Sequence, residues 1–447
     1  MEQKREKFAS RLGFILISAG CAIGLGNVWK FPYITGKYGG AAFVLIYFVF
    51  LLILGIPVLT AELAVGRASQ KSVAMSMDVL EPKGSKWHWF KYPAMAGNYI
   101  LMMFYTTVAG WMVYYFFKFV MGQSAGLGFV SMSTNPTVNM ISMAIVVVLG
   151  FFILSFNLQG GLERVTKYMM VALLVLMIVL AINSCSLSGA AEGLKFYLLP
   201  DLSKINANVV VGAMNQAFFT LSLGIGSMAI FGSYIGKERS LLGESVNIIL
   251  LDTFVAITAG LIIFPACTTY NLEVGAGPGL LFDTMATVFN NMNGGRLWGS
   301  VFFLFMVFAA MSTILAVFEN ILACVRELTG WSRPKGSVIC GIGIFLTSIT
   351  TALGFSVLSG FEPFAPGSSF LDFWDFIVSN NLLPLGSLII ALFCCSKRYG
   401  WGWENFKAEA NTGKGLKVQD WMKPIFQFVV PVGILVVYIM GLVTFAW

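Results

Sequence analysis

The chain has 447 residues, of which 57% are hydrophobic and only 11% are charged, whereas soluble domains carry about 25% charged residues. This composition, with a mean hydropathy of +0.82, excludes an ordinary water-soluble protein and predicts an all-α, polytopic membrane protein. The single histidine, His88, excludes histidine zinc clusters and histidine-centred proton relays. The net charge of +7 suggests either an anionic partner, such as nucleic acid, or basic loops on one side of a membrane.

Apolar runs long enough to span a bilayer recur along the whole chain. A hydrocarbon core of about 30 Å needs roughly 20 residues of helix, and the sequence contains eleven runs of that kind. They are centred on Ile15–Phe31, Phe43–Leu63, Met95–Phe119, Ser142–Phe156, Tyr168–Ala181, Val210–Phe231, Val246–Pro265, Leu297–Ala323, Val338–Phe355, Phe376–Phe393 and Ile425–Phe445. No linker or low-complexity block separates them, which predicts one transmembrane domain over residues 1–447.

The basic residues predict the orientation of these spans. If the N-terminus lies inside the cell, all but six of the 28 Lys and Arg residues fall on cytoplasmic segments; the six are Lys30, Lys37, Lys118, Lys195, Lys204 and Arg296. Basic loops face the cytoplasm in most membrane proteins. We therefore expect a multi-pass protein of the plasma (inner) membrane with a cytoplasmic N-terminus and an extracellular C-terminus. The same bias explains the net charge without nucleic acid.

Two of the spans are interrupted near their middle. The first contains Gly20, Gly24, Gly26 and Asn27, and the sixth contains the run Thr220–Gly226. One interpretation is close helix packing by small residues, which is common in membranes. The other is a pair of unwound helices that line a binding site, as in secondary transporters built from inverted repeats. Adjacent polar residues and the separation of five spans favour the second.

Inverted repeats would divide the domain into a 5+5 arrangement with broken helices 1 and 6. We expect the first repeat over residues of about 8–183, the second over about 209–395, and an extra helix over about 422–446.

Three carboxylates fall inside the predicted spans, where an unpaired charge is costly. Each of them, Glu62, Asp252 and Glu319, therefore requires a partner. For Asp252 we favour a role in binding a cation over a plain hydrogen bond between helices. For Glu62 and Glu319 a structural hydrogen-bonding role is favoured, and a functional one stays open.

Several longer strings resemble a known family. RLGFILISAGCAIGLGNVWKFP at Arg11–Pro32 resembles the first helix of the neurotransmitter:sodium symporter family, whose bacterial members include the leucine transporter. FFTLSLGIGS at Phe218–Ser227 resembles the broken sixth helix of that family, FYTTVAGWMVYY from Phe104 its third and AAMSTILAVFE from Ala309 its eighth. The resemblance covers nearly the whole chain. It implies a sodium-coupled amino-acid symporter of the eleven-helix type that works by alternating access.

The resemblance also implies two sodium sites. The first would use the Ala22 carbonyl, Asn27, Thr220 and Asp252, together with the carboxylate of the substrate. The second would use the carbonyls of Gly20, Ile23 and Ala309 and the hydroxyls of Ser312 and Thr313. All of these ligands are oxygen atoms, which suit a hard alkali cation and not a soft transition metal.

Gly24 indicates the substrate class, because monoamine carriers of the family have an aspartate at this position. Without that aspartate, a substrate carboxylate could enter the site. By resemblance, the carboxylate would contact the Leu25 and Gly26 amides and the Tyr105 hydroxyl, and the ammonium would face the carbonyls of Ala22, Phe219 and Thr220 and the Ser222 hydroxyl. The side-chain pocket would be lined by Leu101, Tyr105, Phe219, Ile225, Ile314 and Val317. This uncharged lining predicts neutral, apolar or aromatic amino acids.

Four positions depart from the commoner family pattern. Asp252 stands where many relatives carry Asn, and its fixed charge predicts transport that does not depend on chloride. Lys30 replaces the usual Arg of the outer gate toward Asp375, and a point charge in place of a bidentate fork predicts a looser gate. At the inner gate Arg5 would pair with Glu327, where relatives carry Asp. In the fifth helix Val171 stands where bacterial relatives often have Pro, ten positions after Gly161, so the inner release route would open differently.

The sequence also bears on function classes other than transport. A transport-incompetent amino-acid sensor on the same fold stays open, because sequence does not distinguish binding from transport. An intramembrane enzyme is disfavoured, because no Ser/His, Cys/His or paired-carboxylate arrangement accompanies the buried carboxylates. We therefore expect no catalytic residues, and the sequence does not indicate an oligomeric state.

Overall fold

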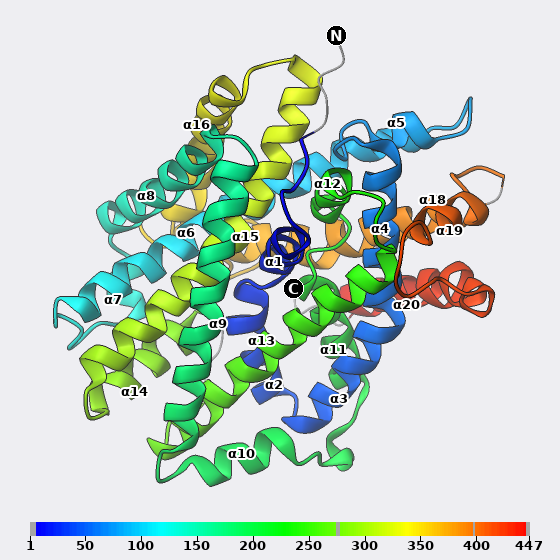
Figure 1. The fold of residues 1–447 in the computed structure, drawn as a ribbon. Coiled ribbons are helices and arrows are strands. Elements are labelled where there is room, and N and C mark those ends of the chain that lie inside the picture. The colour runs from blue at the N-terminus through cyan, green and yellow to red at the C-terminus, as the bar shows by residue number, and fades with distance from the viewer. Residues whose placement is uncertain (1–5, 274–277, 397, 444–447) are drawn as a thin grey trace.

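The computed structural model describes residues 6–273, 278–396 and 398–443. In this part of the chain the regular elements are helices, and the one β-bridge joins Arg239 to Lys414. Long helices pack side by side and surround α1 (Arg11–Ala22), which lies near the centre of the molecule (Figure 1).

Nine helices of the described residues are long and apolar enough to cross a membrane. They are Ala41–Ser69, Trp87–Val120, Pro136–Ser155, Gln159–Cys185, Leu241–Thr269, Gly295–Thr329, Arg333–Ala352, Phe370–Cys395 and Asp420–Val443. Short π-helical or 3₁₀ turns interrupt several of them. The α-helical parts are α3 (Ala41–Phe50), α4 (Ile56–Ser69), α6 (Lys91–Val120), α8 (Pro136–Ser155), α9 (Arg164–Cys185), α13 (Leu241–Thr269), α15 (Gly295–Thr329), α16 (Arg333–Ala352), α17 (Phe370–Asp375), α18 (Leu383–Cys395) and α20 (Val430–Val443).

The two interrupted spans are helix pairs. The first consists of α1 and the helical segment Gly26–Lys37, which ends in α2 (Phe31–Lys37), and the two parts are bent by 52°. The expected sixth span coincides with α11 (Ala207–Thr220) and α12 (Ser227–Tyr234). Each expected run thus corresponds to a helix or a helix pair. Of the extra helix predicted over about 422–446, the part after residue 443 lies outside the described residues.

Shorter helices connect the spans. They are α5 (Ser76–Leu80), α7 (Phe129–Ser133), α10 (Ala190–Leu198), α14 (Ala286–Asn291) and α19 (Trp403–Ala410). In Figure 1, α10 closes one end of the bundle and α5 lies toward the opposite end.

Burial follows the position of each helix in the bundle. α1 packs against α9, α13 and α15 and buries most of its residues, as expected for a helix that is apolar on all sides. By contrast, α9 and α20 keep large apolar side chains exposed, including Val175 at 55% and Val432 at 57%. An exposed apolar face on a spanning helix contacts lipid, so α9 and α20 lie at the periphery and the central helices position the site.

Candidate functional site

The first helix breaks where the sequence predicts it. α1 ends at Ala22, Ile23 adopts an extended conformation, and helix resumes at Gly26. A Cβ atom at Gly24 would collide with the Oη atom of Tyr105 and the Oγ1 atom of Thr313. Any larger residue there would displace both groups, and the break frees backbone carbonyls inside the bundle, where they can bind a ligand or ion.

The second break lies between α11 and α12. Its residues include three with positive φ: Ser222 at 50°, Gly224 at 92° and Gly226 at 76°. The buried carboxylate of Glu62 accepts hydrogen bonds from the amides of Gly224 and Met228, each at 3.0 Å. The predicted partner of Glu62 is therefore the backbone of the broken helix, which the carboxylate stabilises from α4.

Three of the side chains expected at the first sodium site are in direct contact. Nδ2 of Asn27 lies 2.8 Å from Oδ1 of Asp252, and Oγ1 of Thr220 lies 3.3 Å from Oδ2 of Asp252. All three residues are buried. No ion pair links Asp252 to a basic side chain within the described residues. A buried carboxylate that faces only neutral groups is a favourable place for a cation.

The residues expected at the second sodium site form one hydrogen-bonded cluster. Oγ of Ser312 donates to the carbonyls of Ile23 at 3.2 Å and Ala309 at 2.9 Å. Oγ1 of Thr313 lies 3.2 Å from the carbonyls of both Gly20 and Ile23. The break in the first helix therefore places three carbonyl and two hydroxyl oxygens of distant segments together. An all-oxygen set of this kind suits a hard cation.

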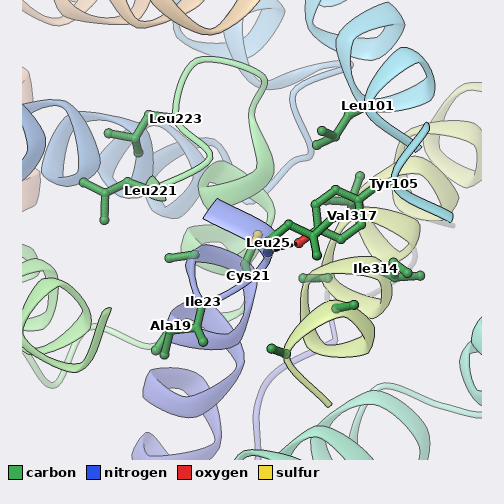
Figure 2. Close-up of a cluster of buried hydrophobic side chains, with 14 of the residues drawn as sticks. Ala19, Cys21, Ile23, Leu25, Leu101, Tyr105, Leu221, Leu223, Ile314 and Val317 are labelled. Carbon is green, nitrogen blue, oxygen red and sulfur yellow. Dashed lines mark hydrogen bonds between the residues drawn. The ribbon is translucent and has the colours of Figure 1, made fainter. Parts of the chain in front are cut away.

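A small cavity lies between the two breaks. Its free volume of about 10 Å³ is about that of one water-sized sphere, so the site is contracted in this structure. The cavity is lined by Ala22, Gly24, Gly26, Leu101, Tyr105, Phe219, Ser222, Thr313 and Leu383. None of these side chains is charged. Beside the cavity, the Leu25 amide donates a hydrogen bond of 2.8 Å to Oη of Tyr105 (Figure 2).

Not every residue expected to bind substrate lines this cavity. Six do: Ala22, Gly26, Leu101, Tyr105, Phe219 and Ser222. The others lie nearby but outside the lining. Ile314 and Val317 are buried, and a Cβ atom at Gly150 of α8 would lie 3.7 Å from Cγ2 of Ile314. The carbonyl of Ile225 accepts a hydrogen bond from Nδ2 of Asn98 at 2.7 Å.

The expected outer gate pair is formed. Nζ of Lys30 lies 3.3 Å from Oδ2 of Asp375 and 3.9 Å from the centre of the Phe219 ring. A second, larger cavity lies on the side of this pair, lined by residues that include Trp29, Asp375 and Phe219. Since Phe219 lines both cavities, its ring separates the outer cavity from the contracted one.

The inner gate is described only in part, because Arg5 lies outside the described residues. Its expected partner, Glu327, accepts hydrogen bonds from the amide and the hydroxyl of Ser72, the latter at 2.6 Å. In the fifth helix, Gly161 lies in a π-helical turn and Val171 lies within continuous α9.

Sequence reasoning missed an ionic cluster at the same end. Arg333 donates to both carboxylate oxygens of Glu319, at 2.8 and 2.7 Å, and Oη of Tyr234 donates to Oε1 of Glu319 at 2.7 Å. Glu6 pairs with Arg333 at 3.1 Å and with Arg326 at 3.5 Å. These contacts supply the partner that the buried Glu319 requires. They also attach the N-terminal segment to α15 and α16.

Comparison with known proteins identifies the family. The profile of the Sodium:neurotransmitter symporter family matches residues 5–126 and 127–447. The chain belongs to this family. It is 34% identical to YhdH of Bacillus subtilis (strain 168), described as an uncharacterized sodium-dependent transporter, over 99% of this chain and 100% of that protein. An uncharacterized sodium-dependent transporter of Haemophilus influenzae is 31% identical, with 98% and 99% covered.

A solved structure supports the same family assignment. The crystal structure of MhsT in complex with L-phenylalanine matches with a TM-score of 0.89 and 37% sequence identity, and the match covers 98% of this chain and 100% of that one. The predicted family and all-α polytopic fold are therefore confirmed. The chain is a multi-pass, sodium-coupled transporter of a small molecule and not an enzyme.

Proposed function

We propose that the transporter imports neutral, apolar or aromatic L-amino acids together with sodium, by alternating access to the site between the two helix breaks. The observation that carries this proposal is the contracted cavity, because its lining is uncharged while the buried Asp252 carboxylate contacts Asn27 and Thr220, the sequence neighbours of the lining residues Gly26 and Phe219. The uncharged lining disfavours a substrate with a charged side chain. The buried carboxylate of Asp252 calls for a cation. That MhsT binds L-phenylalanine supports the aromatic part of the proposal.

The substrate carboxylate would lie against the first break. The Leu25 amide donates to Oη of Tyr105, and a carboxylate placed between them could accept hydrogen bonds from both groups. Gly24 presents no side chain there. The ammonium would face the carbonyl end of α11 and the Ser222 hydroxyl, where the helix dipole favours a positive charge.

Two sodium ions would occupy the two oxygen clusters. One would lie between Asp252, Asn27, Thr220 and the Ala22 carbonyl, and the other among the oxygens around Ser312 and Thr313. With a tenfold gradient and 100 mV, two ions supply roughly 7 kcal/mol, which supports a substrate gradient of about 10⁵.

Chloride would not be needed. The fixed charge of Asp252 contacts Asn27 and Thr220 directly, so it can balance the charge of a bound sodium ion without a mobile anion. The Lys30–Asp375 pair would close the outer side, and Arg5 with Glu327 would close the cytoplasmic side. If the N-terminus is cytoplasmic, as the distribution of basic residues predicts, the C-terminus would be extracellular.

The substrate class is tested by competition in proteoliposomes. Uptake of labelled phenylalanine is driven by a sodium gradient, and unlabelled leucine, tyrosine, lysine or glutamate is added in excess. We expect leucine and tyrosine to compete and lysine and glutamate not to, and we expect uptake to continue when gluconate replaces chloride. Equal competition by lysine or glutamate would overturn the proposed specificity, and loss of uptake in gluconate would overturn chloride independence. Binding without accumulation would instead favour a sensor.

A further inference from the structure

The lining of the contracted cavity contains one residue from outside the helices expected to form the site. Leu383 is the first residue of α18 and is only 2% exposed. The other lining residues come from the first break, from α6, from the second break with α11, and from α15. We propose that Leu383 limits the size of the substrate side chain that the cavity accepts. This inference rests on the proposed amino-acid transport.

Close backbone packing fixes the position of Leu383. A Cβ atom at Gly224 would collide with the Leu383 carbonyl, and a Cβ atom at Gly386 would collide with the Gly224 carbonyl. The N-terminal turn of α18 therefore lies directly against the second helix break. Neither backbone can shift toward the other, so the break and the first turn of α18 set each other's nearest approach at the cavity.

The opposite side of the break is fixed as well. The Gly224 amide donates to the Glu62 carboxylate on α4 at 3.0 Å. The segment that carries Ser222 is thus held between α4 and α18. A wall that is supported from both sides discriminates ligands by size, because adapting to a larger ligand costs packing energy.

The helical segment that contains Leu383 also contains Asp375 of the expected outer gate. Asp375, at the end of α17, precedes Leu383 by eight residues in the helical segment Phe370–Cys395, and the residues between them, Phe376–Leu382, form a π-helical stretch. When Asp375 pairs with Lys30, Leu383 is held at the cavity wall. The size limit therefore applies with the outer gate closed.

Truncation and enlargement at this position should shift specificity in opposite directions. We would measure inhibition of sodium-driven phenylalanine uptake by tryptophan and by valine, and use the ratio of the two inhibition constants. Leu383→Ala should make tryptophan a stronger inhibitor relative to valine by at least about tenfold, because small changes in the volume of an apolar pocket change discrimination by that order. Leu383→Phe should shift the ratio in the opposite direction.

The control is Ile390→Ala on the same helix. Ile390 is also 2% exposed but is not part of the cavity lining, so its truncation should weaken packing and leave the ratio unchanged. If Leu383→Ala does not fold, Leu383→Val provides the smaller truncation. An unchanged ratio in the Leu383 variants would overturn the inference alone. No competition by any neutral amino acid in the unmodified chain would overturn both the inference and the proposed function.

Discussion

At the scale of single residues, the proposed substrate class depends most on Gly24. A side chain there would meet Oη of Tyr105 and Oγ1 of Thr313, the first beside the cavity and the second in the proposed second sodium site. An aspartate of the kind found in monoamine carriers cannot be accommodated without rearranging both. Gly24 would therefore link the proposed substrate site with the proposed second sodium site.

Replacing Gly24 by alanine should impair transport. The new methyl group overlaps two functional oxygens, and overpacking of this kind costs about 1–3 kcal/mol, so the KM for amino acid should rise about tenfold or more. Gly343→Ala is the matched control, because a Cβ atom at Gly343 meets nothing within 4 Å. Initial rates of sodium-driven uptake measure both variants. A KM that is unchanged in Gly24→Ala would contradict the account of the first break.

Sequence motifs anticipated many of the local groupings at this scale but not every contact. The five proposed ligands of the second sodium site, Ser312 and Thr313 among them, lie in one cluster. Their roles as ligands remain predictions. Leu383 and the Glu6–Arg333 pair were not predicted, because each depends on which distant segments touch and neither carries a motif. No periodicity in the sequence marks such contacts.

At the scale of elements, the two helix breaks depend on groups outside them. The second break has three residues with positive φ, a conformation that is unfavourable for a residue other than glycine, such as Ser222. Glu62 compensates by accepting hydrogen bonds from two amides with separate oxygens. The conformation of the second break therefore depends on Glu62 of α4 as well as on the glycines of the break.

Changing Glu62 to glutamine should weaken this element. Glutamine keeps one acceptor oxygen but presents an NH₂ group to the other amide, and a buried donor left unsatisfied costs about 1–3 kcal/mol. We expect a lower thermal midpoint for the purified protein and slower uptake. Glu404→Gln, at a site whose side chain is 80% exposed, is the control. Equal midpoints for Glu62→Gln and the unmodified chain would show that the break is stable without the carboxylate.

The sequence predicted where helices form better than it predicted where they begin and end. Apolar runs located every span, yet the run Leu297–Ala323 became the longer helix Gly295–Thr329, because its ends include charged residues such as Arg296, Arg326 and Glu327 that an apolar run does not mark. Glycines and polar residues marked both breaks correctly. What they could not give was the extent of each break, which is set by partners such as Glu62 and α18.

At the scale of the whole molecule, charged pairs stabilise both sides of the central cavity. On one side Lys30 pairs with Asp375 above the Phe219 ring. On the other, Glu6 and Arg333 attach the N-terminal segment to α16. The contracted cavity between them fits a state in which the site is closed, and the proposed alternating access would require these two contacts to open in turn.

Sodium coupling at Asp252 is the central claim, and accumulation of labelled phenylalanine in proteoliposomes tests it most directly. The unmodified chain and Asp252→Ala would be compared under an inward sodium gradient and with potassium in place of sodium. Thr258→Val is the control, because Thr258 is a buried polar residue of the same helix whose hydroxyl, among the residues that the structure describes, bonds only to the carbonyl of Phe254. We predict concentrative, sodium-dependent uptake by the unmodified chain and by Thr258→Val, and its loss in Asp252→Ala. Sodium-driven accumulation that persists in Asp252→Ala would contradict the account.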